Sequence, residues 1–346
     1  MIANSASNAK DVAVLADGIR VAAWGDGANV YAQRFDTAGA LAGDKLQVAT
    51  AANFSGLAAL ASGGYVVQYQ TPDAVLAQLV TASGALAGSP ITVRTQAQIT
   101  ADYPPNPAYP AENATLAAGG GVVALPDGGF AAQYIKYQAS HIPGTIPYEV
   151  FAQKFDAAGN AVGTPMLLSS EGSATSFTTA SVPSNGLLVA DILACPCSGS
   201  GAPGTTVFDA NLQRAHIAFG GMPGNNSSPS AAQMTDQNFI MVWTAGSAVQ
   251  GQVFGPDSST ATGTRNITAV ITFDNAVPGS RVIALAGGGF LIAGGGAAQA
   301  FDASGQPVSP VMQILDGNVA ATADGGFVDV AQVGAQLVQQ QYSIAH

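Results

Sequence analysis

The nine residues YAQRFDTAG, Tyr31–Gly39, decide the fold because copies of them recur along the chain. FAQKFDAAG stands at Phe151–Gly159, and the shorter copy QAFDASG stands at Gln299–Gly305. The shared pattern is Gln-x-Phe-Asp-x-x-Gly. Weaker copies lie at Gln78–Gly84, Phe208-Asp209, Gln252–Phe254 and Gln340–Tyr342. These seven copies predict seven structurally similar units.

A second pattern, a turn of small residues followed by an apolar run, precedes each copy. It reads Asp-Gly-Gly-Phe in its clearest forms, at Asp127–Phe130 and Asp324–Phe327. The other five stand at Asp17-Gly18, Gly63–Tyr65, Asn185–Leu187, Asn238-Phe239 and Gly288–Phe290. The aromatic position of the first pattern recurs roughly every 45 residues, with one longer interval, and such a period is typical of one four-stranded propeller blade.

Each unit predicts four short strands joined by turns. In the first unit these strands are Val12–Ala16, Val21–Trp24, Val30–Phe35 and Leu46–Ala49. The Asp of the repeated pattern is expected to cap backbone N–H groups in a tight turn, and its Gly to take a positive φ. The 42 glycines and 19 prolines leave almost no room for helices. Since one sheet cannot bury its own faces, we expect neighbouring sheets to pack together and close into a ring.

The two ends of the chain predict how the ring closes. The seventh unit stops at its third strand, near Tyr342, whereas Met1–Ser5 align with the fourth strand of the first unit. We therefore expect Met1–Ser5 to complete the last sheet. The predicted fold is all-β, a single seven-bladed β-propeller of four-stranded antiparallel blades over residues 1–346. Its units are 12–50, 57–95, 121–170, 177–220, 230–270, 280–315 and 317–346 with 1–5.

Composition restricts the possible partners. Charged residues make up 9% of the chain, against about 25% in a typical soluble domain. With 48% apolar residues and a mean hydropathy of +0.27, the surface must consist mainly of small neutral side chains. Such surfaces are more usual in secreted, surface or self-associating proteins.

A net charge of −11 argues against nucleic acid as a partner. No apolar run is long enough to span a membrane, and Met1–Asp11 contain no recognisable cleavable signal peptide.

The copies at Tyr31–Gly39 and Phe151–Gly159 resemble repeats of large bacterial secreted and surface proteins. Relatives of this kind are often exported by type I systems, and some carry RTX calcium repeats or adhesin modules. The resemblance implies a scaffold and an extracellular or cell-surface location, not an activity. The chain has no Gly-Gly-x-Gly-x-Asp nonapeptides, so the resemblance does not imply calcium binding.

Four insertions interrupt the regular period and are expected on one face of the propeller, where binding residues concentrate. They are Gln96–Thr115, Lys136–Tyr148, Cys195–Gly204 and Gly221–Ser230. Their candidate binding residues are Tyr103, Tyr109, His141 and Tyr148. Exposed tyrosines of this kind stack on sugars or anchor a protein partner. The alternative is that these side chains pack the loops onto the scaffold.

The third insertion contains both cysteines of the chain, Cys195 and Cys197, around one proline. Three interpretations remain open for them: two inert thiols, a disulfide within or between molecules, or a metal or redox site. A disulfide across one residue is strained, and a metal site needs further Cys or His ligands. We therefore predict no metal site.

Catalytic patterns are scarce. The chain has three histidines and no Gly-x-Ser-x-Gly nucleophile elbow, and its aspartates lie mostly in predicted turns. No catalytic residue and no cofactor are predicted. The favoured function is a non-enzymatic extracellular structural or adhesive propeller that assembles with itself into an oligomer or filament. The alternative is a propeller that binds glycans or a surface protein through the insertions. A glycoside hydrolase or lyase is the less favoured third possibility.

Overall fold

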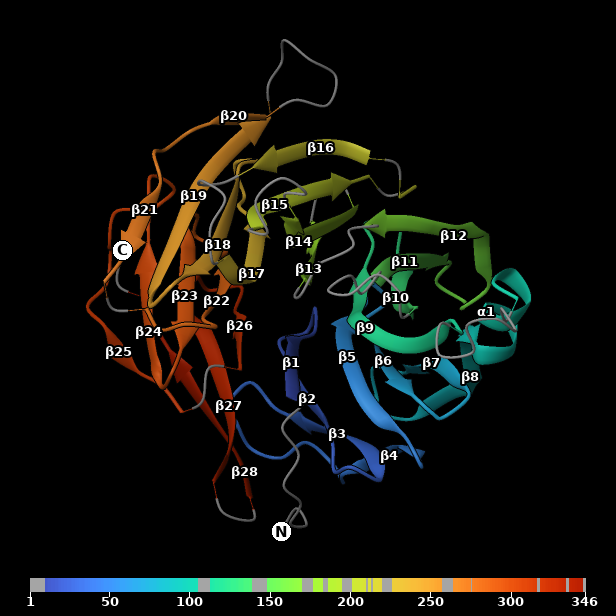
Figure 1. Cartoon of the computed structure of the whole chain (residues 1–346). Helices are drawn as coiled ribbons and strands as arrows, with labels where there is room; N and C mark the ends of the chain where they lie inside the picture. The colour runs from blue at the N-terminus through green and yellow to red at the C-terminus, as the bar shows by residue number, and fades with distance from the viewer. Residues whose placement is uncertain are drawn as a thin grey trace. The chain divides into compact units, whose positions relative to one another are not determined.

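A computed structural model describes most of the chain (Figure 1). The described residues are 10–104, 113–138, 148–169, 177–182, 186–194, 201–209, 211–212, 214–219, 226–256, 264–274, 276–315, 318–333 and 336–344. They form strands β1 to β28 and one short helix, α1 (Gln96–Asp102). The chain divides into two compact units, an N-terminal unit within residues 5–35 and 41–174 and a C-terminal unit within 36–40 and 175–346.

The N-terminal unit contains three antiparallel sheets, each of four strands in chain order. Blade 1 consists of β1 (Lys10–Val14), β2 (Arg20–Gly25), β3 (Asn29–Phe35) and β4 (Leu46–Thr50). Blade 2 consists of β5 (Asn53–Ala59), β6 (Tyr65–Gln70), β7 (Ala74–Val80) and β8 (Leu86–Thr95). Blade 3 consists of β9 (Thr115–Ala124), β10 (Phe130–Tyr137), β11 (Tyr148–Phe155) and β12 (Ala161–Ser169). The first strands of neighbouring blades, β1, β5 and β9, contact one another (Figure 1).

The C-terminal unit contains four more antiparallel sheets. Blade 4 consists of β13 (Phe177–Val182), β14 (Gly186–Ala194), β15 (Gly201–Phe208) and β16 (Arg214–Phe219). Blade 5 consists of β17 (Asn226–Gln233), β18 (Phe239–Ala245), β19 (Ala248–Pro256) and β20 (Thr264–Asn266), with β21 (Ile271–Phe273) also on β19. Blade 6 consists of β22 (Arg281–Ala284), β23 (Phe290–Gly294), β24 (Ala297–Phe301) and β25 (Met312–Gln313). The last sheet consists of β26 (Val319–Ala321), β27 (Phe327–Val333) and β28 (Gln336–Tyr342).

The prediction of four-stranded antiparallel blades is confirmed, but the structure has six such blades rather than seven. The last sheet, β26–β28, has three strands among the described residues. This sheet does not count as a four-stranded blade, because the residues described after β28, Ser343 and Ile344, do not form a strand. The predicted fourth strand, Met1–Ser5, lies outside the described residues.

The repeated pattern forms a hydrogen-bonded corner between the third and fourth strands of a blade. In blade 3, Gln153 Nε2 donates to the carbonyls of Lys154 (2.9 Å) and Val162 (3.2 Å). Asp156 Oδ1 accepts from two turn amides, at 2.9 and 2.8 Å, and Gly159 has φ +86°. The prediction of a capped turn with a positive-φ glycine is therefore confirmed. The glutamines that bond backbone carbonyls in the same way are Gln33, Gln78, Gln252 and Gln299.

Cores lie between successive blades because side chains alternate along each strand. In β6, Tyr65 and Val67 pack into the core shared with blade 1, whereas Val66 packs into the core shared with blade 3. In the second of these cores Phe130 stacks on Phe155, with ring centroids 5.0 Å apart. Fully burying one such ring contributes about 2–3 kcal/mol. In the C-terminal unit, equivalent aromatic pairs occur in blades 5 and 6 and in the last sheet.

Candidate functional site at the base of two insertions

Helix α1 opens the first insertion immediately after β8. Thr95 caps it: the Thr95 hydroxyl accepts from Gln98 N (3.1 Å), and Gln98 Oε1 accepts from Thr95 N (2.9 Å). This reciprocal capping box satisfies amides that the first turn leaves free. On its inner side Ile99, 1% exposed, packs into the core between blades 2 and 3. The first residues of the insertion are therefore part of the scaffold.

The two ends of the first insertion are fastened together by one side chain. Gln96 Nε2 donates to the carbonyl of Ala114 (2.9 Å), while Gln96 Oε1 accepts from Leu116 N (2.8 Å). Both bonds satisfy backbone groups at the start of β9. The helix and the returning strand are thus held at one place on the blade.

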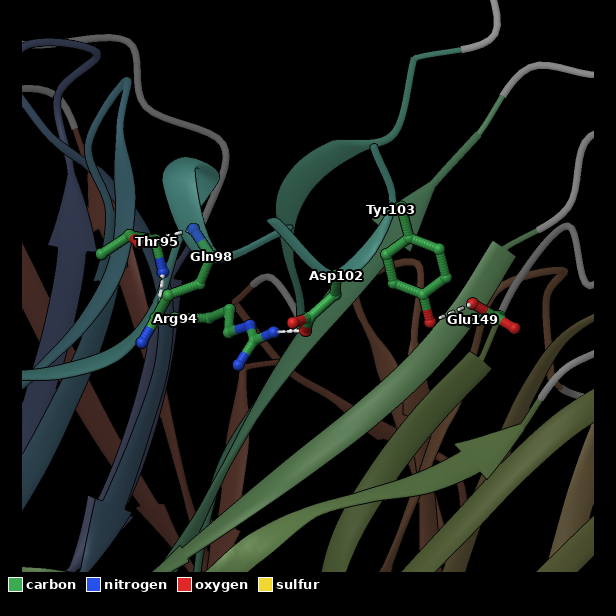
Figure 2. Close-up of polar contacts among 6 residues, drawn as sticks. All are labelled: Arg94, Thr95, Gln98, Asp102, Tyr103 and Glu149. Carbon is green, nitrogen blue, oxygen red and sulfur yellow. Dashed lines mark hydrogen bonds and ion pairs between the residues drawn. The ribbon is translucent and has the colours of Figure 1, made fainter. Parts of the chain in front are cut away.

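The second insertion leaves the same place, between β10 and β11. Lys136 and Glu149 are directly paired across these strands, and their charged groups lie 2.5 Å apart. Tyr103, just after α1, lies against both residues. Its ring centroid is 3.9 Å from Lys136 Nζ, and its hydroxyl donates to Glu149 Oε2 (3.3 Å; Figure 2). Glu149 and the face of Tyr103 together compensate the charge of Lys136, which is 5% exposed.

A second ion pair flanks this cluster. Arg94, at the end of β8, pairs with Asp102 at the end of α1 (Figure 2). The Arg94 guanidinium also lies 5.8 Å from the ring centroid of Tyr134, which stacks on Phe151 at 5.2 Å. The pair therefore fixes the end of α1 relative to the blade below it.

The electrostatics of the cluster favour a structural role over acid–base chemistry. Burial, followed by the charge of Glu149, raises the pKa of Tyr103. Burial also raises the pKa of Tyr134 to about 12. Both phenols therefore stay protonated near neutral pH and do not act as bases there. Among the described residues no group of three or more His, Cys, Asp or Glu side chains is placed to hold a metal.

The structure describes two of the four candidate binding residues. Tyr103 is partly buried and contacts Lys136 and Glu149. Tyr148 is the first residue of β11, opposite Tyr137. Tyr109 and His141 lie outside the described residues, and so do Cys195 and Cys197. Lys136 and Glu149 were missed as a pair, because they are separated by an insertion whose return register the sequence does not indicate.

Comparisons with known proteins identify the fold only. No family model matches the chain, and no curated protein matches it. The propeller of Dos1 matches with a TM-score of 0.54 and 12% identity, over 95% of this chain and 76% of that one. A functionally unknown protein from Desulfotomaculum acetoxidans matches at 0.50 with 11% identity, over 88% and 89%. Prolyl oligopeptidase B from Galerina marginata also matches at 0.50 with 11% identity, over 92% of this chain and 45% of that one.

Together with the observed sheets, these matches define the class of the protein: an all-β propeller with four-stranded antiparallel blades. In this chain the propeller carries insertions fastened to its third blade. No helix in the part of the chain that the structure describes is long and apolar enough to cross a membrane.

Proposed function

We propose that the protein is a non-enzymatic extracellular structural or adhesive propeller that associates with copies of itself through the outer strands of its blades. The observation that carries the proposal is the surface of the N-terminal unit. Its three outer strands, β4, β8 and β12, contain one charged residue, Arg94. Exposed aliphatic side chains stand on two of them: Leu86 is 44% exposed, Val162 44% and Leu167 39%.

Sheet edges without charges usually invite pairing with another strand, and here the edges are modified. The pairing of β7 with β8 and of β11 with β12 shifts register twice in each case. Pro90 in β8 and Pro165 in β12 have no amide hydrogen to donate. These features oppose strand addition and leave the exposed side chains as the means of contact. We therefore expect association through apolar side chains that strengthens with added salt.

Sedimentation velocity over a concentration series tests this proposal. The variant Val162→Lys places a charge on the outer strand of blade 3 and is expected to weaken association at least tenfold. Ala157→Lys is the matched control, because it adds the same charge to an exposed turn of the same blade. A wild-type protein that stays monomeric at its highest soluble concentration contradicts the proposal, and so does equal weakening by both variants.

The extracellular location rests on the low charge and on the resemblance to bacterial surface repeats. Fractionation of the native host, with immunodetection of the protein in medium, surface and cytosolic fractions, tests it. Detection in the cytosol alone contradicts the location.

A second candidate function, binding of a glycan or a surface protein, is favoured by the cluster at the base of the insertions. A buried ion pair and a capped helix hold the bases of both insertions at one place, as a loop-based binding site requires. A glycan array with wild-type protein, Tyr109→Ala and His141→Ala tests it. The Tyr103→Phe variant keeps the ring on Lys136 and serves as the control. Absence of binding, or binding indifferent to the two alanine variants, removes the glycan function.

A further inference from the structure

A cavity of about 230 Å³ lies between blades 1 and 2, inside the N-terminal unit. Its walls come from β3, the connection from β3 to β4, the start of β6 and the turn between β7 and β8. The polar residues that line it are Arg34, Asp44, Lys45, Tyr65 and Ser83, and the apolar ones include Leu46. Pockets for drug-sized molecules occupy about 300–1,000 Å³, so this cavity suits a smaller molecule.

Tyr65, in the wall of the cavity, has a buried hydroxyl without a partner. Tyr65 is fully buried, and its hydroxyl makes no hydrogen bond to the described residues. Leaving a buried polar group unpaired costs about 1–3 kcal/mol. Other blades avoid this cost, since the first residue of the second strand is Phe at positions 130, 239, 290 and 327. Tyr65 departs from the repeat only by its hydroxyl, so that hydroxyl requires an explanation.

The guanidinium of Arg34 is held in position and keeps donor capacity. Arg34 Nη1 donates to the carbonyl of Ser83 across the two blades (2.8 Å), and its Nε is buried without a partner. Its chain packs closely on the neighbouring turn: a Cβ added to Gly84 would lie 2.9 Å from Arg34 Cδ. At the equivalent position, one residue before the end of the third strand, blade 2 has Leu79 and blade 3 has Lys154, which pairs with Asp127. Arg34 instead bonds the carbonyl of Ser83 in the next blade, at the cavity.

The lining of the cavity is cationic although the protein is acidic. Lys45 lies with its Nζ 4.2 Å from the ring centroid of Tyr31. With Arg34 it gives two positive charges against the one negative charge of Asp44, in a chain of net charge −11. Guanidinium groups recognise planar carboxylates through paired hydrogen bonds.

We propose that this cavity binds the carboxylate of a small hydroxylated acid about the size of one sugar residue. Arg34 binds the carboxylate, the Tyr65 hydroxyl donates a hydrogen bond to the ligand, and Lys45 adds charge at the rim. The body of the ligand lies against Ala32 and Leu46. This site lies apart from the insertions and does not depend on the proposed function.

Calorimetric titration with D-glucuronate tests the proposal, with glucose as the neutral control ligand and glucose 6-phosphate as the phosphate control. We expect saturable binding of glucuronate and none of glucose. Tyr65→Phe should weaken binding about tenfold, the effect of losing one hydrogen bond to a charged group. Arg34→Leu should abolish it.

Both variants introduce the residue that another blade has at the equivalent position, so the fold should be retained, and thermal unfolding verifies this. Lys154→Leu, which changes the residue equivalent to Arg34 in blade 3, is the matched control and should bind as the wild type does. The proposal is overturned by no binding of glucuronate, by equal binding of glucose, by a preference for glucose 6-phosphate, or by binding that Arg34→Leu leaves unchanged.

Discussion

The interface between blades 1 and 2 and the interface between blades 2 and 3 both lie between four-stranded antiparallel sheets, but their side chains differ. The first has Tyr65 and Arg34 where the second has Phe130 and Leu79. At the second interface the glycine of the adjoining turn, Gly159, touches apolar groups only: an added Cβ would meet Ile91 and Leu79. At the first, the equivalent Gly84 lies against Arg34. Two side chains, Arg34 of blade 1 and Tyr65 of blade 2, thus distinguish the polar first interface from the apolar second one.

The two interfaces differ in backbone as well as in side chains. Residues 36–45 connect β3 to β4 and include Ala42 to Lys45 of the cavity wall, whereas residues 81–85 connect β7 to the longer strand β8. Arg34 and Tyr65 add the polar groups at the first interface. The predictions that follow alter one interface and use the other as reference.

The largest effect is expected from Gly56→Ala in β5, at the interface between blades 2 and 3. A Cβ at Gly56 would lie 2.8 Å from Gly121 Cα and 2.9 Å from Val122 N. Main-chain atoms cannot relieve this clash by a rotamer change, so β5 and β9 must move apart. We expect the unfolding free energy to fall by about 3 kcal/mol. Denaturant titration measures it.

Gly25→Ala is the reference for this change at the interface between blades 1 and 2. There an added Cβ meets Phe54 N at 3.2 Å, which a small adjustment relieves. Its cost should stay below about 1 kcal/mol. Equal costs for the two variants would show that the interfaces are equally close-packed.

The next effect is expected from Phe130→Tyr, which transfers the hydroxyl of the first interface to the second. Phe130 is fully buried in an apolar core that contains Val66, Leu79 and Ile91. A hydroxyl without a partner there should cost about 2 kcal/mol. The same denaturant titration measures it, and a variant as stable as the wild type would mean that this interface also admits water.

The smallest effect at neutral pH is expected from Tyr65→Phe, which removes a buried unpaired hydroxyl and should raise the unfolding free energy by about 1 kcal/mol. The difference grows in alkali. Burial raises the pKa of Tyr65 to about 12, although the positive charge of Arg34 acts to lower it. Between the unfolded pKa of about 10 and the folded value, the unfolded chain gives up this proton and the folded chain keeps it.

Wild-type stability should therefore be complete below pH 10 and fall as pH rises towards 12, by roughly 2 kcal/mol for this group. Tyr65→Phe should lose less over the same window, while Tyr134 contributes equally to both proteins. Parallel curves of stability against pH for the two proteins would contradict a buried, unpaired phenol.

The sequence predicts the blades well because their signals are local. Asp156 and Gly159 belong to a turn whose geometry follows from their own backbone chemistry. The strands expected for blade 1 lie within about two residues of β1 to β4. The predicted number of complete blades was wrong, because the last sheet has three strands among the described residues.

The candidate site was predictable only in part. The insertions were visible because they interrupt the regular repeat period of the sequence. Thr95-x-x-Gln98 is a capping-box pattern that could have indicated the start of α1. The pairing of Lys136 with Glu149 depends on the register with which β11 returns. The unpaired state of Tyr65 depends on what a neighbouring blade places beside it. Neither property is local in sequence.

The glutamine of each repeat has one further consequence. The side-chain amides of Gln33, Gln78 and Gln153 donate to main-chain carbonyls, both in the third strand and in the segment that leads into or forms the fourth strand. Any sequence that can follow that backbone path is accepted, whatever its side chains. The outermost strand is accordingly an interchangeable part: exchanging β8 for β12 between blades should leave the architecture intact.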